Sequence, residues 1–330
     1  MTSAAQDAAS WLANPRATRE TLEAFGLATK HRLGQNFLVE DNIIRKIIRL
    51  AELTSDDVVL EVGPGLGTLT VAMLDYVRAV CSIEADRELE GVLATTCKEP
   101  HQDSFVLCMG DALKATPQLV GDAYASLGVF ADADGKEESG ALIGPNKFVS
   151  NLPYQVAATL ILLFFQEFTT LEQAIVMVQA EVADRILAKP KTKAYGAYTA
   201  KLALYAQVSG RFEVAPGNFM PPPRVNSAVV RLERAPMTDP SGTGVLTSEQ
   251  LFWVARVIDA AFAQRRKTIR NSMGASGFKK DTLERALLAA HIEPTVRAEA
   301  LGVKDFVRLA MALAEGGAYG EETAFVHGRC

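Results

Sequence analysis

The chain has 330 residues, a formal net charge of −5 and 48% hydrophobic residues, which is typical of a globular protein and excludes a disordered chain. Its length suits one large domain and a smaller one. The longest apolar run, 156–165, is too short to span a bilayer, and no signal peptide pattern opens the chain, so we expect a cytoplasmic protein with no membrane attachment. The four cysteines form no CxxC pair, which argues against a metal site and fits a reducing compartment.

The first half of the chain alternates between strand and helix patterns. Residues 1–28 show weak periodicity, and we expect a flexible leader there. Isoleucines at positions 43, 44, 47 and 48 mark one apolar helix face that follows Asp41. Short apolar strands are predicted at 57–62, 77–83, 105–109 and 148–150, with a helix between the first two that ends near residue 76.

The second half changes character after the last predicted strands. A helix at 156–168, a strand at 174–178 and a helix at 181–187 precede a hairpin of 212–214 and 227–232, and a helical pattern begins near 248. Strands that alternate with helices predict a parallel sheet covered on both faces. The sequence therefore predicts an α/β catalytic domain over 29–235 and a smaller all-helical domain over 236–330.

Charge is segregated along the chain. Residues 121–146 carry five acids and one base, and we interpret them as an acidic insertion between a helix and a strand. Such a connection lies at the N-terminal edge of a parallel sheet, whereas ligands bind at the opposite edge. We therefore expect the insertion to face away from the chemistry, and deletion of 128–141 to leave activity largely intact.

Glycines and acids follow three successive predicted strands. Gly63, Gly65 and Gly67 lie between a strand and a helix, where the backbone can pass close to a ligand. Their GxGxG spacing differs from the GxGxxG of dinucleotide sites and makes a pyrophosphate ligand less favoured. Glu84 and Asp111 end the next two strands, where they can accept hydrogen bonds from ribose hydroxyls and from an adenine amine. This pattern indicates a pocket for adenosine without phosphates, which S-adenosylmethionine fits.

The segment Asn151-Leu152-Pro153-Tyr154 follows the fourth strand at the same edge. An aryl amine is a poor nucleophile, and acceptors such as the Asn151 side-chain oxygen and a neighbouring backbone carbonyl stabilise the charge that grows as a methyl group arrives. Pro153 can hold the carbonyl, and Tyr154 can stack on a base. The pattern predicts methylation of the exocyclic amine of adenine, extruded from structured RNA.

A basic segment can supply contacts to the RNA backbone. Residues 261–280 contain six bases and no acid, among them Arg265, Arg266, Lys267 and Arg270. Together with Lys30-His31-Arg32, they can contact phosphates. A run of this kind also occurs on ordinary solvated helix faces, and the absence of compensating acids favours the nucleic-acid interpretation.

Taken together, the motifs resemble one family, the ribosomal small-subunit RNA adenine dimethyltransferases (the KsgA group). The matching segments span about 30–310 in the family's order and are Gly34-Gln35-Asn36-Phe37-Leu38, Glu61-Val-Gly-Pro-Gly-Leu-Gly67, Glu84-Ala85-Asp86-Arg87, Asp111-Ala112, Asn151-Leu-Pro-Tyr154, Gln179-Ala180-Glu181-Val182, Lys193-Ala-Tyr-Gly196, Phe219-Met-Pro-Pro-Pro223 and Ala261-Phe-Ala-Gln-Arg-Arg-Lys-Thr-Ile-Arg-Asn-Ser272.

The resemblance implies a Rossmann-like class I methyltransferase that dimethylates two adjacent adenosines near the 3′ end of small-subunit rRNA. It implies a monomer acting on the immature small ribosomal subunit. The base would be held by Asn151, Leu152, Pro153 and Tyr154, with Phe219 on its other face, and Arg265, Arg266, Lys267 and Arg270 would meet rRNA. The candidate cofactor-binding residues are Gln35, Asn36, Leu38, Gly63, Gly65, Gly67, Glu84, Asp111, Ala112 and Asn151.

Two alternatives share part of this pattern. A large-subunit rRNA adenine methyltransferase of the macrolide-resistance type has the same glycine loop and N-L-P-Y segment, and the basic segment 264–271 argues against it. A non-catalytic assembly factor is disfavoured by the intact N-L-P-Y segment and cofactor acids. The acidic insertion, the leader and Gln155-Val156-Ala157 depart from the family's pattern.

Overall fold

The computed structural model describes residues 9–27, 35–130 and 143–317. The chain divides into two compact units, Met1–Ala183 with Val208–Arg234, and Asp184–Gln207 with Ala235–Cys330. The chain passes from the first unit to the second between residues 234 and 235, where the domain border was expected. However, residues 184–207, which were expected in the catalytic domain, belong to the second unit. No helix of the described residues is long and apolar enough to cross a membrane.

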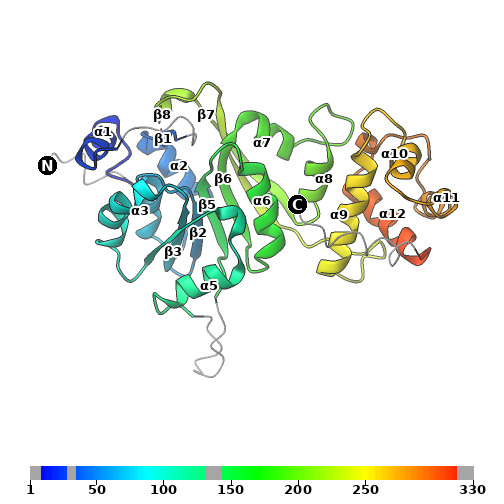
Figure 1. Cartoon of the computed structure of the whole chain (residues 1–330), viewed down its shortest axis with the longest axis horizontal. Helices are drawn as coiled ribbons and strands as arrows, with labels where there is room; N and C mark the ends of the chain where they lie inside the picture. Colours follow the sequence, from blue (N-terminus) through cyan, green and yellow to red (C-terminus); the bar gives the residue numbers. More distant parts are fainter. Residues whose placement is uncertain (1–8, 28–34, 131–142, 318–330) are drawn as a thin grey trace. The chain divides into compact units, whose positions relative to one another are not determined.

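Among the described residues, seven strands form one mixed sheet in the first unit, with helices on both faces (Figure 1). The strands β2, β3, β4, β5 and β6 pair in parallel, and β9 is antiparallel to β6. The order across the sheet is β4 (Phe105–Met109), β3 (Ala79–Glu84), β2 (Val58–Val62), β5 (Lys147–Asn151), β6 (Gln173–Gln179), β9 (Ser227–Arg234) and β7 (Ala206–Val214). The expected α/β fold is confirmed.

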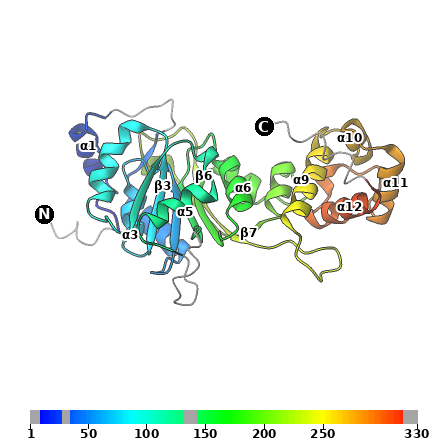
Figure 2. The ribbon, with the colours of Figure 1, turned by 60° about the horizontal axis from the view of Figure 1, so that its bottom comes forward.

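The helices of this unit follow the sequence patterns closely. In α2, the isoleucines at 43, 44, 47 and 48 are buried, and the Glu40 side chain accepts a hydrogen bond from Asn42 N to cap the helix. Figure 2 shows α3 and α6 on opposite sides of the sheet. The helices are α1 (Pro15–Ala24), α2 (Asp41–Ala51), α3 (Thr68–Leu74), α4 (Glu90–Leu93), α5 (Pro117–Ala125), α6 (Ala157–Glu167) and α7 (Ala180–Ile186), which runs into the second unit.

The prediction of a flexible leader over 1–28 is wrong for residues 9–27. They include α1, which Asn14 caps by accepting a hydrogen bond from Ala17 N at 2.8 Å. Ala13 and Leu22 belong to the main hydrophobic core of the first unit. The sequence pattern does not indicate this helix, because two of the side chains that it buries are threonines, Thr18 and Thr21, which weaken the apolar periodicity.

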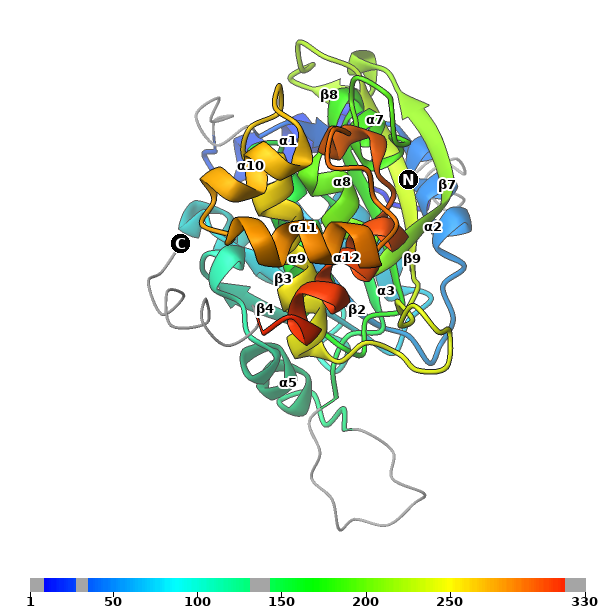
Figure 3. The ribbon, with the colours of Figure 1, turned by 90° about the vertical axis from the view of Figure 1, so that its right-hand side faces the viewer.

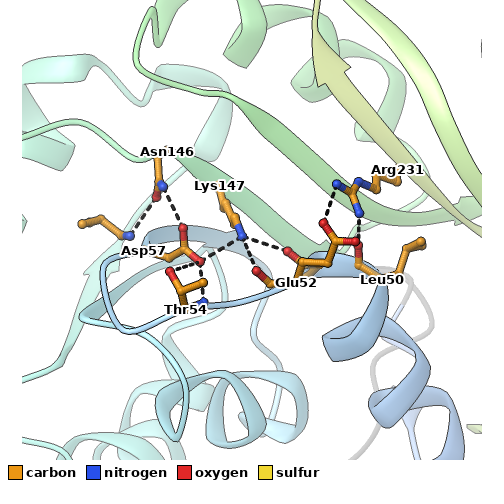
Figure 4. Close-up of polar contacts among 9 residues, drawn as sticks. Leu50, Glu52, Thr54, Asp57, Asn146, Lys147 and Arg231 are labelled. Carbon is orange, nitrogen blue, oxygen red and sulfur yellow. Dashed lines mark hydrogen bonds and ion pairs between the residues drawn. The ribbon is translucent and has the colours of Figure 1, made fainter.

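The acidic segment is shorter than expected at its start. Residues 121–125 are the last turns of α5, so the connection to β5 covers 126–146, of which 131–142 lie outside the described residues. Its far end lies at the N-terminal edge of the sheet, as predicted, because Asn146 Oδ1 accepts a hydrogen bond from Val58 N at 2.8 Å. Figure 4 shows the polar network there, in which Lys147 forms an ion pair with Asp57 (2.9 Å).

The second unit is helical, as predicted for the C-terminal part of the chain. Its helix α9 begins with a capping box. The Thr247 side chain accepts a hydrogen bond from Gln250 N, and the Gln250 side chain accepts one from Thr247 N. Figure 3 shows α9, α10, α11 and α12 packed together. The helices are α8 (Ala197–Leu202), α9 (Ser248–Phe262), α10 (Ile269–Ala275), α11 (Lys280–Ala289) and α12 (Val303–Glu315).

A separate two-stranded sheet joins two distant motifs. The strand β1 (Phe37–Leu38) pairs antiparallel with β8 (Phe219–Met220), so that Leu38 lies opposite Phe219. A cis peptide bond joins Met220 to Pro221 directly after β8. These short strands bring the Gln35–Leu38 segment and the 219–223 segment together, although about 180 residues separate them along the chain.

Candidate active site

Four of the five parallel strands, β2, β3, β4 and β5, end at the same edge of the sheet beside a cavity of about 260 Å³. It brings together the acids predicted at the strand ends and the N-L-P-Y segment. The predicted site residues that line it are Gln35, Asn36, Leu38, Gly63, Gly65, Glu84, Asp111, Ala112, Asn151, Leu152, Pro153 and Tyr154.

Two of the residues predicted to contact the cofactor or the target base, Gly67 and Phe219, do not line the cavity. Gly67 begins α3 with φ of 88°, and a Cβ atom there would collide with Cys97 Sγ, so its backbone packs against a helix instead. Phe219 is only 3% exposed and belongs to the hydrophobic core of the first unit, because β8 turns it inward. In this structure, Phe219 is therefore not placed to stack on a base.

Two other motifs pack closely against the glycine loop. Gly63 and Gly65 both have positive φ, 68° and 63°, which other residues adopt only with strain. A Cβ on Gly63 would lie 3.3 Å from the Pro153 ring, and one on Gly65 would lie 3.2 Å from the Phe37 ring. The two glycines therefore allow N-L-P-Y and the segment at 35–38 to approach the loop closely.

The two predicted ribose and adenine acids differ in environment. Glu84 is buried, and burial raises its pKa, although the backbone N–H groups of Asp86, Gly65 and Ala85 donate to it and oppose the rise. Asp111 is exposed, and its Oδ1 accepts a hydrogen bond from Leu113 N at 3.0 Å. In both residues, a hydrogen bond from a backbone N–H group fixes the position of one carboxylate oxygen beside the cavity.

The N-L-P-Y segment presents two acceptors. Asn151 Nδ2 donates a long hydrogen bond to the Asn36 carbonyl (3.5 Å), which turns the Oδ1 atom away from that carbonyl. The Pro153 carbonyl is occupied, because the N–H groups of Val156 and Ala157 donate to it at 3.2 and 3.1 Å. Among the described residues, no hydrogen bond to the Leu152 carbonyl is found, so the segment offers that carbonyl and Asn151 Oδ1 as acceptors.

Tyr154 is fixed at its far end. Its hydroxyl exchanges a hydrogen bond with Ser227 Oγ at 2.7 Å, and burial raises its pKa. Tyr154 lines the cavity with its hydroxyl anchored in this way.

Sequence reasoning missed two acids of the cavity wall, Glu61 and Asp86. Burial raises the pKa of Glu61 to about 7, although the hydroxyls of Ser82 and Thr70 donate to its Oε2. A single acid inside the apolar strand 58–62 was the available signal for Glu61. Asp86 lies two residues after Glu84, where its charge resembled that of an ordinary loop acid.

The lining of the cavity is one-sided in charge. It includes Glu61, Glu84, Asp86 and Asp111, and none of the described residues that line it is lysine, arginine or histidine. An anionic ligand would meet unfavourable charge there, whereas a cationic or neutral ligand would not. No group of three or more potential metal ligands is found among the described residues.

The predicted RNA-binding residues in the second unit have different surroundings. Arg265 donates to the Lys193 carbonyl at 2.7 Å and lies 3.6 Å from Glu299, so it holds a loop. Arg266 is exposed. Lys267 and Arg270 line a surface hollow together with Lys280. The segment Lys30-His31-Arg32 lies outside the described residues.

The fold has counterparts among solved structures. A dimethyladenosine transferase from Plasmodium falciparum aligns with a TM-score of 0.66 at 23% identity, over 85% of this chain and 98% of that one. The 23S rRNA methyltransferase ErmE aligns with a TM-score of 0.57 at 25% identity, over 84% of this chain and all of that one. The fold is that of the Rossmann-like methyltransferases.

Sequence comparison identifies a family within this class of methyltransferases. The family model described as ribosomal RNA adenine dimethylase matches residues 26–315. Proteins named ribosomal RNA small subunit methyltransferase A are 38% identical, from Kineococcus radiotolerans over 92% of this chain and 93% of theirs, and from Streptomyces coelicolor over 91% and 96%. The chain therefore belongs to the ribosomal RNA adenine dimethylase family.

Proposed function

We propose that this chain transfers methyl groups from S-adenosylmethionine to the N6 amines of two adjacent adenosines near the 3′ end of small-subunit rRNA. It acts as a cytoplasmic monomer on the immature small ribosomal subunit. The observation that carries the proposal is the single cavity in which Glu84, Asp111 and Asn151 meet without any basic side chain. The relatives named small subunit methyltransferase A support the choice of subunit.

The cavity residues fit this cofactor. Glu84 can accept hydrogen bonds from the ribose hydroxyls, and Asp111 from the adenine amine. The acid-only lining suits a ligand with a positive sulfonium and no phosphates, whereas a dinucleotide would place its pyrophosphate against carboxylates. When bound, S-adenosylmethionine supplies an electrophilic methyl group.

The chain's own contribution to the reaction is to orient and polarise the amine. Asn151 Oδ1 and the Leu152 carbonyl accept hydrogen bonds from the N–H groups of the amine, two before the first transfer and one before the second. These bonds favour a pyramidal nitrogen and stabilise the positive charge that develops there. Leu152 is held in register because its N–H donates to the Met177 carbonyl at 3.1 Å. No general base is required, because the amine loses a proton readily once it carries the methyl group.

The hollow in the second unit supports a role in binding the RNA backbone. Lys267, Arg270 and Lys280 gather around it, and phosphates are the anions that RNA presents. Replacing Lys267 and Arg270 with alanine should lower the slope of log affinity against log salt by about two, roughly one for each cation. An unchanged slope would remove these two residues from the interface. Arg265→Ala should instead reduce the stability of the second unit, because it loses its bond to the Lys193 carbonyl.

The proposed reaction is tested with purified ribosomal subunits from a strain that lacks the enzyme. With tritiated S-adenosylmethionine, label should enter the small subunit only, and mass spectrometry of the digested rRNA should find dimethyladenosine at two adjacent positions. Label in the large subunit would favour the activity named for ErmE, to which the fold is also similar. Binding without any label would indicate an assembly factor that does not catalyse.

A further inference from the structure

Residues 35–38, which we call the strap, contact three motifs of the cavity: the end of β3, the glycine loop and the N-L-P-Y segment. Gln35 Nε2 donates to Asp86 Oδ2 at 2.8 Å, beside the end of β3. The Asn36 carbonyl accepts the hydrogen bond from Asn151 Nδ2. Phe37 packs over Gly65, and Leu38 pairs with Phe219. The strap therefore links the cofactor acids to the residue that orients the methyl acceptor.

Asp86 holds the first end of the strap. It is only 9% exposed, and both of its carboxylate oxygens are engaged. Its Oδ1 accepts a hydrogen bond from Glu88 N at 3.2 Å, which leaves Oδ2 to face Gln35. Its own backbone N–H donates to Glu84 Oε1 at 2.8 Å. A side chain fixed at one oxygen by the backbone is a rigid anchor for its partner at the other.

We propose that Asp86 is a positioning residue for methyl transfer, which acts through Gln35 to hold the strap against the cofactor and against Asn151. The inference rests on the proposed function. The path of bonds runs from Glu84 to Asp86, then through Gln35 and Asn36 to Asn151. Loss of the Gln35 contact removes the bond between the strap and Asp86, and a shift of the strap moves the Asn36 carbonyl that holds the Asn151 amide. Small misplacements of orienting groups cost large factors in rate.

The contact can be broken and rebuilt with reversed polarity. Gln35→Glu places a second carboxylate against Asp86, so the two repel and the strap shifts. Adding Asp86→Asn restores both the net charge and a hydrogen bond, now donated by Asn to the new carboxylate. We expect Gln35→Glu to raise the Kd for S-adenosylmethionine about tenfold or more, and the double variant to return it to within about threefold of wild type.

The chain contains a matched control. In α5, Gln118 Nε2 donates to Asp122 Oδ1 at 2.9 Å, and neither residue lines the cavity. Gln118→Glu, with and without Asp122→Asn, makes the same chemical changes on an exposed helix surface. These control variants should leave the Kd and the turnover within about twofold of wild type, since surface changes away from special contacts have small effects.

The measurements are calorimetric titration of the free protein with S-adenosylmethionine, and kcat and KM on small subunits. A positioning role predicts that Gln35→Glu lowers kcat at saturating cofactor and that the double variant restores it. Unchanged affinity in Gln35→Glu, or a double variant no better than the single one, would overturn the inference. If Gln35→Glu does not fold, Gln35→Met removes the same bond without adding charge. Wild-type affinity for S-adenosylmethionine in that variant would likewise overturn the inference.

The calorimetric cycle requires no RNA, so it separates this inference from the proposed function. Wild-type protein that binds the cofactor but labels no small subunit would overturn the proposed substrate, while the cycle still tests Asp86. Wild-type protein that does not bind S-adenosylmethionine at all would overturn the proposed cofactor itself.

Discussion

At the N-terminal edge of the sheet, burial acts to raise the pKa of Asp57, but hydrogen bonds from Lys147, Thr54 and Asn146 outweigh it and hold that pKa below its ordinary value (Figure 4). At the C-terminal edge, burial also acts on Glu61 and Glu84, and there it prevails, so that both pKa values are raised. The difference lies in the partners, because the first edge supplies a buried ammonium group and the second supplies no cation among its described lining residues.

The contrast separates stability from function within one sheet. A buried carboxylate with a full set of partners stabilises the ionised folded state, whereas carboxylates left without a cation carry an electrostatic cost that a cationic ligand can relieve. We therefore expect changes at the N-terminal edge to alter the free energy of unfolding, and changes at the C-terminal edge to alter binding and turnover.

The largest effect should come from Lys147→Met. Lys147 Nζ donates to the Ala51 and Glu52 carbonyls and pairs with Asp57, so its loss leaves a buried carboxylate without its counter-charge. We expect the free energy of unfolding to fall by about 3–5 kcal/mol. Urea unfolding measures this, with the cofactor Kd unchanged. Lys147→Met combined with Asp57→Asn should recover much of the loss, and a single-variant cost below about 1 kcal/mol would contradict the contrast.

Asn151→Ala should lower turnover and leave the stability of the fold unchanged, the opposite of Lys147→Met. Removal of one preorganised acceptor is expected to lower kcat by about a hundredfold or more, equivalent to about 3 kcal/mol of transition-state stabilisation. RNA binding, measured by filter retention, and the melting temperature should stay near wild type. A variant with unchanged turnover would show that Asn151 does not hold the amine.

Local patterns were sufficient to predict one part of this architecture. The functional residues lie at the ends of the strands or within two residues of them, as with Glu84, the last residue of β3, and Asn151, the last residue of β5. Strand position and site position therefore come from the same short window. The family resemblance then supplied predicted roles for Gln35, Asn36 and Leu38.

Long-range pairing could not be predicted in this way. Strands of two residues such as β1 and β8 have no alternation to detect, so neither the burial of Phe219 nor the contact between Gln35 and Asp86 was foreseen. The ion pair of Asp57 with Lys147 joins residues 90 positions apart, and nothing near either residue marks the other. Tertiary packing of the chain decides these contacts.

A pH series tests the C-terminal edge without any ligand. The pKa of Glu61 rises from 4.5 to about 7 on folding, so the unfolded chain ionises first as the pH increases, and stability is lost between about pH 4.5 and 7. Glu61→Gln keeps an acceptor for the Ser82 and Thr70 hydroxyls and cannot ionise. The difference in unfolding free energy, wild type minus variant, should therefore fall by about 2–3 kcal/mol over that range. A constant difference would mean that Glu61 does not hold its proton on folding.

Glu84→Gln is the smallest of these changes in free energy, and it tests both sides of the contrast at once. The variant loses a charged acceptor for the ribose hydroxyls, so we expect the cofactor Kd to rise about tenfold or somewhat more. It also removes a carboxylate whose ionised form burial disfavours, while the amide oxygen can still accept the hydrogen bond from Asp86 N. The melting temperature at neutral pH should therefore stay the same or increase. If affinity and melting temperature fall together, Glu84 stabilises the fold as Asp57 does, and the two edges of the sheet do not differ in the way described.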